Sequence, residues 1–451
     1  MEKSGGFLLP SILKIISLYR PPLNFFFRAP IHQNTYFLRI FANSMEFLQH
    51  TLSNGIRLVL KPMANGQTAH FGLTVNAGSR DELDNEQGLA HFIEHCLFKG
   101  TKRRKAFHIL NRMDSVGAEL NAYTTKEETV IYASFLKSHF ERAIEAIADI
   151  ALNSVFPEKE ILKEKDVILD EILSYQDSPA ELIFDDFEEL IFKNHPIGRN
   201  ILGTEESVKA LSKKDILHFI GRRYKTSEMV LSAVGDLDFK KFVRLAERYF
   251  GDIPESAPAS PRKPITEIRT ERRVVEMDTF QAHLMMGGVA YPNDHKMRTA
   301  TVLMNNYLGG PAMNSRLNMN IRERHGIAYN IESSYQPYVD SGIFSIYLGT
   351  DKKLIEKSEK LVRKELKNIR DNALTSTALH RTKLQFKGQF ALAQEGGMNM
   401  MLALGKSIIS RDEVISTVDL MQKLDAVTAS DILQVANELL DDDKMSVLIY
   451  G

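Results

Sequence analysis

From Glu46 onward, apolar and polar positions follow strand-like alternation or helix-like spacing along most of the chain, which predicts a mixed α+β protein. The first alternating stretch, Phe47–Leu60, contains the turn sequence Ser53-Asn-Gly and predicts a strand, a turn and a second strand. The same patterns predict strands over 69–77, 128–135 and 229–235, and helices over 140–153, 158–176, 180–192 and 215–224. The first half of the chain therefore predicts a sheet with helices packed on it.

The second half of the chain repeats features of the first. Asp215-Ile-Leu precedes Gly235 by twenty residues, and Asp431-Ile-Leu precedes Gly451 by the same interval. Similar offsets at both ends of the repeat indicate a duplicated fold of roughly 200 residues. Between the copies, 252–267 carries four prolines among small residues, which is typical of a linker. We expect an extension over 1–44, a first domain over 45–253, a linker over 254–266, and a homologous second domain over 267–451.

Composition narrows the classes of partner. The chain has 57 basic and 58 acidic residues and a formal net charge of −1, so no charge excess favours nucleic acid. Its one cysteine, Cys96, excludes an intramolecular disulfide, and no apolar run reaches the ~18 residues of a membrane span. We therefore expect no nucleic-acid partner and no transmembrane segment.

Residues 1–44 are basic, with Glu2 as their single acid. A secretory signal is one reading, although Pro10 and Lys14 interrupt its apolar part. An organellar presequence is another, although Pro21-Pro22 would break its amphipathic helix. We expect the third reading, a poorly ordered extension before a start at Met45, and hence a cytoplasmic protein. A targeting role for 1–44 would instead indicate the periplasm or the mitochondrial matrix.

The strongest chemical signal is His91-Phe-Ile-Glu-His95, inside an apolar segment long enough for about three turns of buried helix. Positions i, i+3 and i+4 share one helix face, so His91, Glu94 and His95 point the same way. This is the inverted zincin pattern H-x-x-E-H, in which two imidazoles bind a metal ion and the carboxylate acts on water. The alternative is a pair of hydrogen-bonded core histidines. Three buried polar groups on one face would each need a partner, which favours the metal.

A set of motifs carries a resemblance to a known family: Asn76-Ala-Gly-Ser-Arg80, His91-Phe-Ile-Glu-His95, Phe98-Lys-Gly-Thr101, Leu120-Asn-Ala-Tyr-Thr124 and Glu164-Lys-Asp-Val-Ile-Leu-Asp-Glu171. With them the chain resembles the pitrilysin/insulinase family of zinc metallopeptidases, particularly shorter members similar to the mitochondrial processing peptidase and its bacterial relatives. The resemblance implies an α+β fold of two homologous domains of about 200 residues, each a mostly antiparallel sheet with helices packed on it, together forming half of a clamshell. It also implies that 45–253 is the catalytic zinc-binding domain and that 267–451 is a substrate-binding domain without metal ligands.

The resemblance also implies roles for further residues. Glu171, 76 residues after His95, matches the third ligand of one Zn²⁺ per chain, and Glu164 matches a carboxylate that orients a ligand imidazole. Spacing alone would leave Glu171 open to a salt bridge. Arg322 and Tyr329 match an oxyanion-binding pair, although the sequence by itself does not separate Arg322 from Arg324.

Asn121 and Ala122 match edge-strand residues that pair with substrate backbone in that family. The leading hypothesis is a zinc endopeptidase that cleaves peptides or unfolded and presequence segments inside a dimeric chamber. One chain holds all the motifs, which favours a homodimer over a heterodimer with a related chain. The alternatives are a non-catalytic structural subunit of the same fold, whose zinc ligands are typically lost, and a zinc hydrolase of non-peptide substrates.

Overall fold

The computed structural model describes residues 47–451, so the predicted extension 1–44 lies outside the described residues. Its first half contains β1 (Leu48–Thr51), β2 (Arg57–Pro62), β3 (Thr68–Val75), α2 (Leu89–Leu97), α3 (Ala106–Asp114), β4 (Glu119–Thr124), β5 (Thr129–Leu136), α4 (Phe140–Asn153), α5 (Glu158–Gln176), α6 (Pro179–Ile191), α7 (Glu205–Ala210), α8 (Lys213–Arg223), β6 (Met229–Gly235) and α9 (Phe239–Phe250). The second half contains β7 (Arg272–Val275), β8 (Ala282–Val289), α10 (Arg298–Gly309), β9 (Ala328–Pro337), β10 (Gly342–Thr350), α11 (Ile355–Asp371), α12 (Ser376–Gln394), α13 (Gly397–Arg411), α14 (Thr417–Ala426), α15 (Ala429–Leu439) and β11 (Ser446–Tyr450). The α+β prediction is confirmed.

Each half builds its own sheet. The first has the strand order β1-β2-β6-β3-β5-β4 and the second has the order β7-β11-β8-β10-β9. All neighbours are antiparallel except β2 with β6 and β11 with β7. Both sheets are thus mostly antiparallel, as expected. Strands β4 and β9 occupy equivalent edges of the two sheets.

The predicted duplication is visible in the helices as well. Helices α5 and α6 begin 218 positions before α12 and α13, and each pair is broken by a short irregular segment. The predicted helix at 215–224 begins earlier, at Lys213, because Ser212 and Asp215 form a capping box around its first turn. In that box the Ser212 N–H donates to the Asp215 carboxylate at 2.8 Å.

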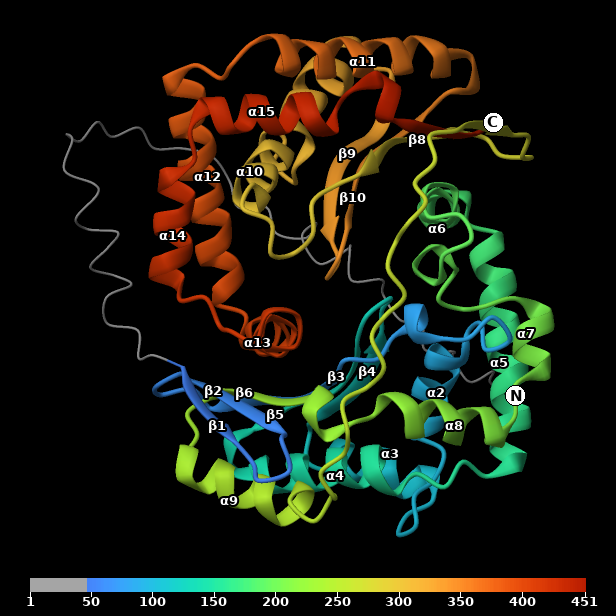
Figure 1. The fold of residues 1–451 in the computed structure, drawn as a ribbon, viewed down its shortest axis with the longest axis vertical. Coiled ribbons are helices and arrows are strands. Elements are labelled where there is room, and N and C mark those ends of the chain that lie inside the picture. Colours follow the sequence, from blue (N-terminus) through green and yellow to red (C-terminus); the bar gives the residue numbers. More distant parts are fainter. Residues whose placement is uncertain (1–46) are drawn as a thin grey trace.

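Each sheet is covered on one face by helices of its own half and on the other face by a helix of the opposite half. Helix α13 lies against β3 and β6 of the first sheet, where Met401 and Leu404 pack on Val230 and Val234. Helix α6 in turn lies against β8 and β11 of the second sheet. Figure 1 shows α13 near the centre of the molecule, above the first sheet, and α6 below the end of the second. The exchange of helices ties the halves together through apolar contacts.

The proline-rich segment connects the halves along the surface and contains no helix or strand between 254 and 270. It is nevertheless held in place, because the Arg262 guanidinium donates to both oxygens of Asp81 at 3.0 and 2.9 Å. A second ion pair, Arg80 with Asp340 at 2.9 Å, joins the first half to the β9–β10 hairpin. The exact domain boundaries stay a prediction.

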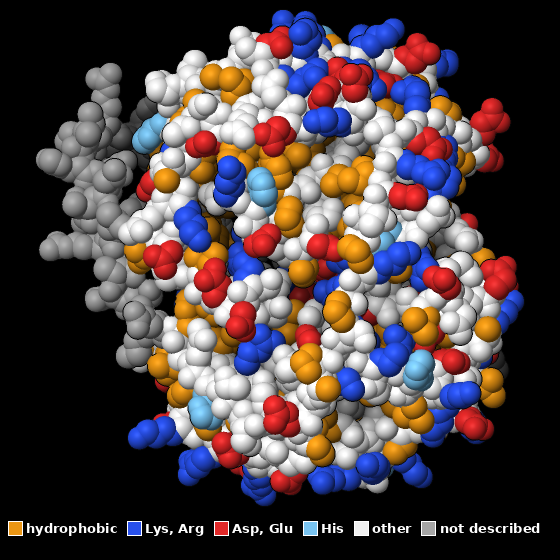
Figure 2. All heavy atoms as spheres, in the orientation of Figure 1, with side chains coloured by type: hydrophobic (Ala, Val, Ile, Leu, Met, Phe, Trp, Pro, Cys, Tyr) orange, Lys and Arg blue, Asp and Glu red, His pale blue; other side chains and the backbone are white. Residues whose placement is uncertain are grey.

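Hydropathy of the helices and surface charge can both be compared with the composition. No helix within residues 47–451 is long and apolar enough to cross a membrane. Figure 2 shows acidic and basic side chains interspersed over the face it presents.

Candidate active site

Helix α2 presents the predicted motif. Its N-terminus is fixed by Gly88, whose φ of 84° lies in the left-handed region and whose added Cβ would lie 2.5 Å from the Leu202 carbonyl oxygen. Glu82 accepts hydrogen bonds from the backbone N–H groups of Gly88 and Ala90 at 2.9 and 2.8 Å. A buried carboxylate at this position accepts hydrogen bonds from N–H groups that have no partner within the helix, and its negative charge interacts favourably with the positive end of the helix dipole. The helix that carries the motif is therefore anchored at its first turn.

The two histidines of α2 face a glutamate of α5. The ring centroids of His91 and His95 are 4.7 Å apart. Their Nε2 atoms lie 3.8 and 3.6 Å from Glu171 Oε2, and one donor atom from each of the three residues lies within 4.8 Å of the others. It is the only such group of three or more potential ligands found in residues 47–451. The structure thus brings Glu171 to the two histidines of α2, although it follows His95 by 76 positions in the sequence.

The donor set fits zinc. Two imidazole nitrogens and one carboxylate are a ligand set of catalytic zinc sites, which keep a further position for water. Bonds of about 2.0–2.1 Å in tetrahedral geometry would put the donor atoms about 3.3 Å apart, close to the observed separations. These separations are too long for direct hydrogen bonds. An ion between the side chains explains their convergence better than mutual contact does.

Glu164 and Lys99 hold His95 in place. The Nδ1 atom of His95 lies 3.2 Å from Glu164 Oε2, and the Lys99 ammonium lies 2.7 Å from Glu164 Oε1. Burial would raise the pKa of Glu164, but its hydrogen bonds with His95 and Lys99 lower it overall. A carboxylate that accepts from Nδ1–H leaves Nε2 of His95 free to bind a metal. This contact is the one expected of Glu164, whose role stays a proposal.

The electrostatics of the two histidines differ. Burial, with a contribution from the charge of His95, lowers the pKa of His91 to about 3. Burial also acts to lower the pKa of His95, but the hydrogen bond with Glu164 and the charges of Glu171 and Glu94 raise it. His91 is therefore a neutral imidazole, the form that binds metals. Its Nδ1 atom is buried and has no hydrogen-bond partner within residues 47–451.

Glu94 lies between the histidines on the same face of α2 and is 6% exposed. Burial raises its pKa, while the hydroxyl and backbone N–H of Thr124 act in the opposite direction. A carboxylate with a raised pKa beside a metal group has the properties of a general base for water. Thr124 ends strand β4, so the strand and the helix meet at the site.

Strand β4 offers a free edge next to Glu94. It pairs only with β5 within the described chain and packs against α2. Asn121 is exposed, whereas Ala122 is 3% exposed. The Asn121 side-chain oxygen accepts the Ala122 N–H at 2.8 Å, so an incoming peptide that paired with this N–H would displace that bond.

Arg322 and Tyr329 lie in the second half. Arg322 is in the π-helical turn Asn318–Glu323 and Tyr329 is on the edge strand β9, where it is 64% exposed. Within residues 47–451, neither side chain makes a hydrogen bond or ion pair with His91, Glu94, His95 or Glu171. Their catalytic role stays a prediction.

Three residues that position the site were missed by sequence reasoning: Glu82, Lys99 and Thr124. Lys99 and Thr124 stand inside motifs quoted above, next to residues that were chosen. Glu82 has no comparable signal, because its contact with the first turn of α2 follows from the path of a loop.

Comparisons with known proteins agree with this geometry. A family described as "Insulinase (Peptidase family M16)" matches residues 57–205, and one described as "Peptidase M16 inactive domain" matches residues 210–386. The chain is 34% identical over 402 residues to an "uncharacterized zinc protease" of Rickettsia bellii, which covers 88% of this chain and 96% of that protein. It is 31% identical over 402 residues to the "uncharacterized zinc protease YmxG" of Bacillus subtilis, with 89% and 97% covered. A solved protease from Helicobacter pylori shares the fold with a TM-score of 0.84 at 21% identity, covering 90% of this chain and 99% of that one.

Proposed function

The chain belongs to the insulinase (M16) family of zinc proteases, and we propose that it is an endopeptidase that cleaves extended peptides or unfolded segments of proteins, presequences among them. One observation carries the proposal: the donor atoms of His91, His95 and Glu171 converge to within 4.8 Å beside the buried Glu94. A structural subunit of the same fold would have no need for this costly group of ionisable side chains.

His91, His95 and Glu171 would hold one zinc ion per chain. Zinc bound there supplies a Lewis acid that polarises a peptide carbonyl and lowers the pKa of water to about 7. Glu94 accepts the proton of the attacking water and then delivers it to the nitrogen of the leaving amine. The hydroxyl and backbone N–H of Thr124 favour the charged form of Glu94, which is the form that accepts a proton. Glu164, held by Lys99, keeps the His95 ring in its binding orientation.

The substrate would bind as an added strand on the free edge of β4. Asn121 and Ala122 supply backbone groups for this pairing, which reads extended chains with little sequence preference. Hydrogen bonds from Arg322 and Tyr329 would stabilise the oxyanion of the tetrahedral intermediate. Because these two lie in the other half, on exposed positions, we propose that they act on the substrate of a partner chain.

Assembly follows from the same proposal. Two copies of the chain, each forming one half of the clamshell, would enclose a chamber that admits unfolded chains and excludes folded proteins. A homodimer is the simplest assembly because one chain carries both the zinc motif and the Arg322–Tyr329 pair. A heterodimer with a related chain would show two different polypeptides in the native particle.

The test is Glu94→Gln. We expect this variant to keep about one zinc per chain and to lose peptide cleavage by about 10³-fold or more, because the proton acceptor is removed while the ligands remain. Metal analysis and a fluorogenic peptide assay measure the two properties on the same sample. Turnover at the wild-type rate would remove Glu94 from the mechanism.

A further inference from the structure

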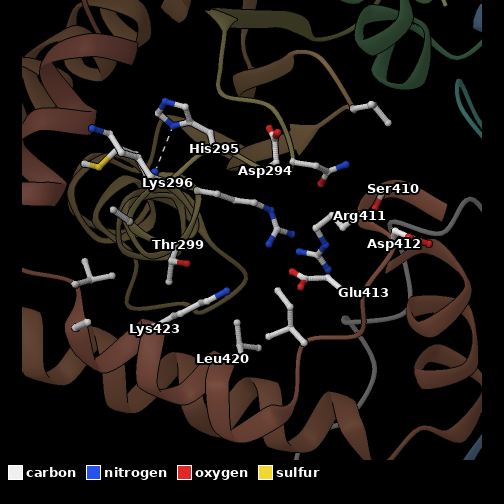
Figure 3. A pocket seen from close by; sticks show the side chains of 18 of the residues that line it. Asp294, His295, Lys296, Thr299, Ser410, Arg411, Asp412, Glu413, Leu420 and Lys423 are labelled. Carbon is white, nitrogen blue, oxygen red and sulfur yellow. Dashed lines mark hydrogen bonds between the residues drawn. The ribbon is translucent and has the colours of Figure 1, made fainter. Parts of the chain in front are cut away.

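A cavity of about 880 Å³ lies in the second half, and none of its lining residues belongs to the metal group or to β4. It is bounded by the start of α10, the end of α13 with the loop that follows, and α14. Figure 3 shows Arg411 at the end of α13 and Glu413 on the loop that follows it, His295 and Lys296 before α10, and Leu420 and Lys423 on α14. Its volume is within the range of sites that bind small molecules.

Two arginines line this cavity without an acidic partner. Arg298 and Arg411 form no ion pair within residues 47–451, and the Nε atom of each is buried without a hydrogen-bond partner there. Arg411 donates one hydrogen bond, to the Ser407 hydroxyl at 2.8 Å. Burial lowers the pKa of both arginines, and the nearby charge of Arg298 lowers the pKa of Arg411 further. Two close, partly buried positive charges are costly unless an anion binds between them.

The acids that line the cavity do not provide that anion. Asp412 pairs with Arg57 at 2.7 Å, and Asp431 accepts the N–H and hydroxyl of Thr428. Asp294 and Glu413 also line the cavity; both are exposed, and the described residues contain no ion pair of either acid with Arg298 or Arg411. The charge of Glu413 acts to raise the pKa of Arg411, against the effect of burial. Lys423 adds a further positive charge to the lining. The guanidinium groups are therefore available to a ligand.

The rest of the lining indicates what the ligand is. Ile409, Ile415 and Leu420 provide apolar surface beside the arginines. Val339 also lines the cavity, and its N–H donates to Glu127 at 3.1 Å, in the turn that follows β4. One residue of the cavity wall is thus hydrogen-bonded to the turn at the end of the strand proposed to pair with substrate. A ligand with one oxyanion and an adjoining apolar group matches these walls.

We propose that Arg298 and Arg411 form a carboxylate-binding subsite for the C-terminal end of a short peptide, with its last side chain against Ile415 and Leu420. The choice of a peptide carboxylate over another oxyanion rests on the proposed peptidase function, whereas the oxyanion site itself rests on the arginines. The subsite would retain the ends of peptides that the enzyme takes in or produces.

Binding to the full-length Glu94→Gln protein tests this subsite without cleavage. The probe is an acetylated pentapeptide ending in leucine, prepared as the free acid and as the C-terminal amide, with binding measured by calorimetry. We expect the free acid to bind about tenfold more tightly than the amide, because a charge-assisted hydrogen bond is lost in the amide. Arg298→Gln with Arg411→Gln should reduce this ratio to about one and leave the affinity of the amide unchanged.

Lys296→Gln is the matched control, because Lys296 lines the same cavity but is exposed and its charge is screened. We expect the tenfold ratio to persist in it. Circular dichroism and zinc content verify that the double variant is folded. A ratio that persists in the folded double variant would overturn the subsite, as would equal binding of acid and amide by the parent protein. Tighter binding of inorganic phosphate than of the free acid would overturn the choice of a carboxylate. None of these results depends on cleavage, so failure of the subsite and failure of the peptidase proposal are distinguishable.

Discussion

Helices α2 and α5 in the first half and helices α10 and α12 in the second are built on the same plan, but only the first pair brings together three side chains that could bind a metal ion. In α2 the inward face presents His91, Glu94 and His95, whereas α10 contains no His, Asp or Glu and buries Ala300, Leu303 and Met304. The 218-residue offset places Thr382 and Gln389 of α12 where α5 has Glu164 and Glu171. The two helix pairs are visible on the two sides of the exchanged helix α13 (Figure 1).

The comparison separates what the fold requires from what the chemistry requires. The second pair shows that the same packing forms with uncharged side chains, apolar in α10 and Thr382 and Gln389 in α12. The first pair keeps Glu94 and Glu171 where burial raises the pKa of both. Groups held in an unfavourable environment without a packing need are expected at functional sites. The first pair thus gives up stability for a metal group.

Among variants that compare the two helix pairs, replacing the distant ligand Glu171 should have the largest effect. We expect Glu171→Gln to lose zinc and to lower peptide cleavage by more than about 100-fold. Replacing a residue that only contacts a metal ligand lowers activity by about 10- to 100-fold, and replacing a ligand itself should lower it further. Gln389→Glu, which adds a carboxylate at the equivalent position of α12, should leave about one zinc per chain. Metal analysis after gel filtration measures both variants. Full metal retention by Glu171→Gln would move the third ligand elsewhere.

Exchanging the inward residues of α2 and α10 tests the cost of the metal group. Leu303→Glu should destabilise the protein by about 3 kcal/mol, because Leu303 is fully buried and a carboxylate there has no partner. Glu94→Leu should raise the thermal midpoint of the metal-free protein while abolishing cleavage. Thermal unfolding in a chelator measures both. A lower midpoint for Glu94→Leu would show that Glu94 has a structural role.

Replacing Lys99, which contacts the metal group only through Glu164, should have a smaller effect. Its ammonium binds Glu164 at 2.7 Å, and Glu164 in turn contacts the ligand His95. Lys99→Gln should weaken zinc binding by about tenfold, as loss of a residue around the ligands does. Competition with a chromophoric chelator gives the affinity. Lys102→Gln, at an exposed position nearby, should match the wild type.

The smallest effect is expected at the contact between the halves. The hydrogen bond and charge of Arg80 lower the pKa of Asp340 below its ordinary value of 3.8, although burial acts against this shift. A carboxylate with a lowered folded-state pKa stabilises the protein above its unfolded pKa, and this stability is lost as the pH falls through the folded value. Because Asp340 is 36% exposed, Asp340→Asn should cost only about 0.5–1 kcal/mol at pH 7. The urea midpoints of the two proteins should begin to converge as the pH falls below about 4 and should meet only below the lowered pKa of Asp340; a difference that stays constant would contradict the ion pair.

Local patterns predicted much of this structure. The helix spacing of His91, Glu94 and His95 placed three groups on one face, and Ser178-Pro179 marked the break between α5 and α6. The repeated segments near Gly235 and Gly451 predicted the duplication that the two sheets confirm. These features depend on residues close in the chain or on similarity between two stretches of it.

Features that depend on distant contacts could not be predicted in this way. Nothing in α6 or α13 indicates that each covers the sheet of the opposite half, because an apolar face does not specify its partner. The choice of Glu171 rested on family resemblance, since a carboxylate 76 residues from His95 has no local signature. The cavity between α10, α13 and α14 likewise joins distant segments, because its lining residues within 293–300 and within 409–431 are more than 100 positions apart.

Anomalous X-ray diffraction at the zinc edge, from crystals of protein supplied with zinc, tests the central claim most directly. The account predicts one zinc peak per chain, within bonding distance of His91 Nε2, His95 Nε2 and a carboxylate oxygen of Glu171. A map with no peak at these three residues, or with its peak at other residues, would contradict it.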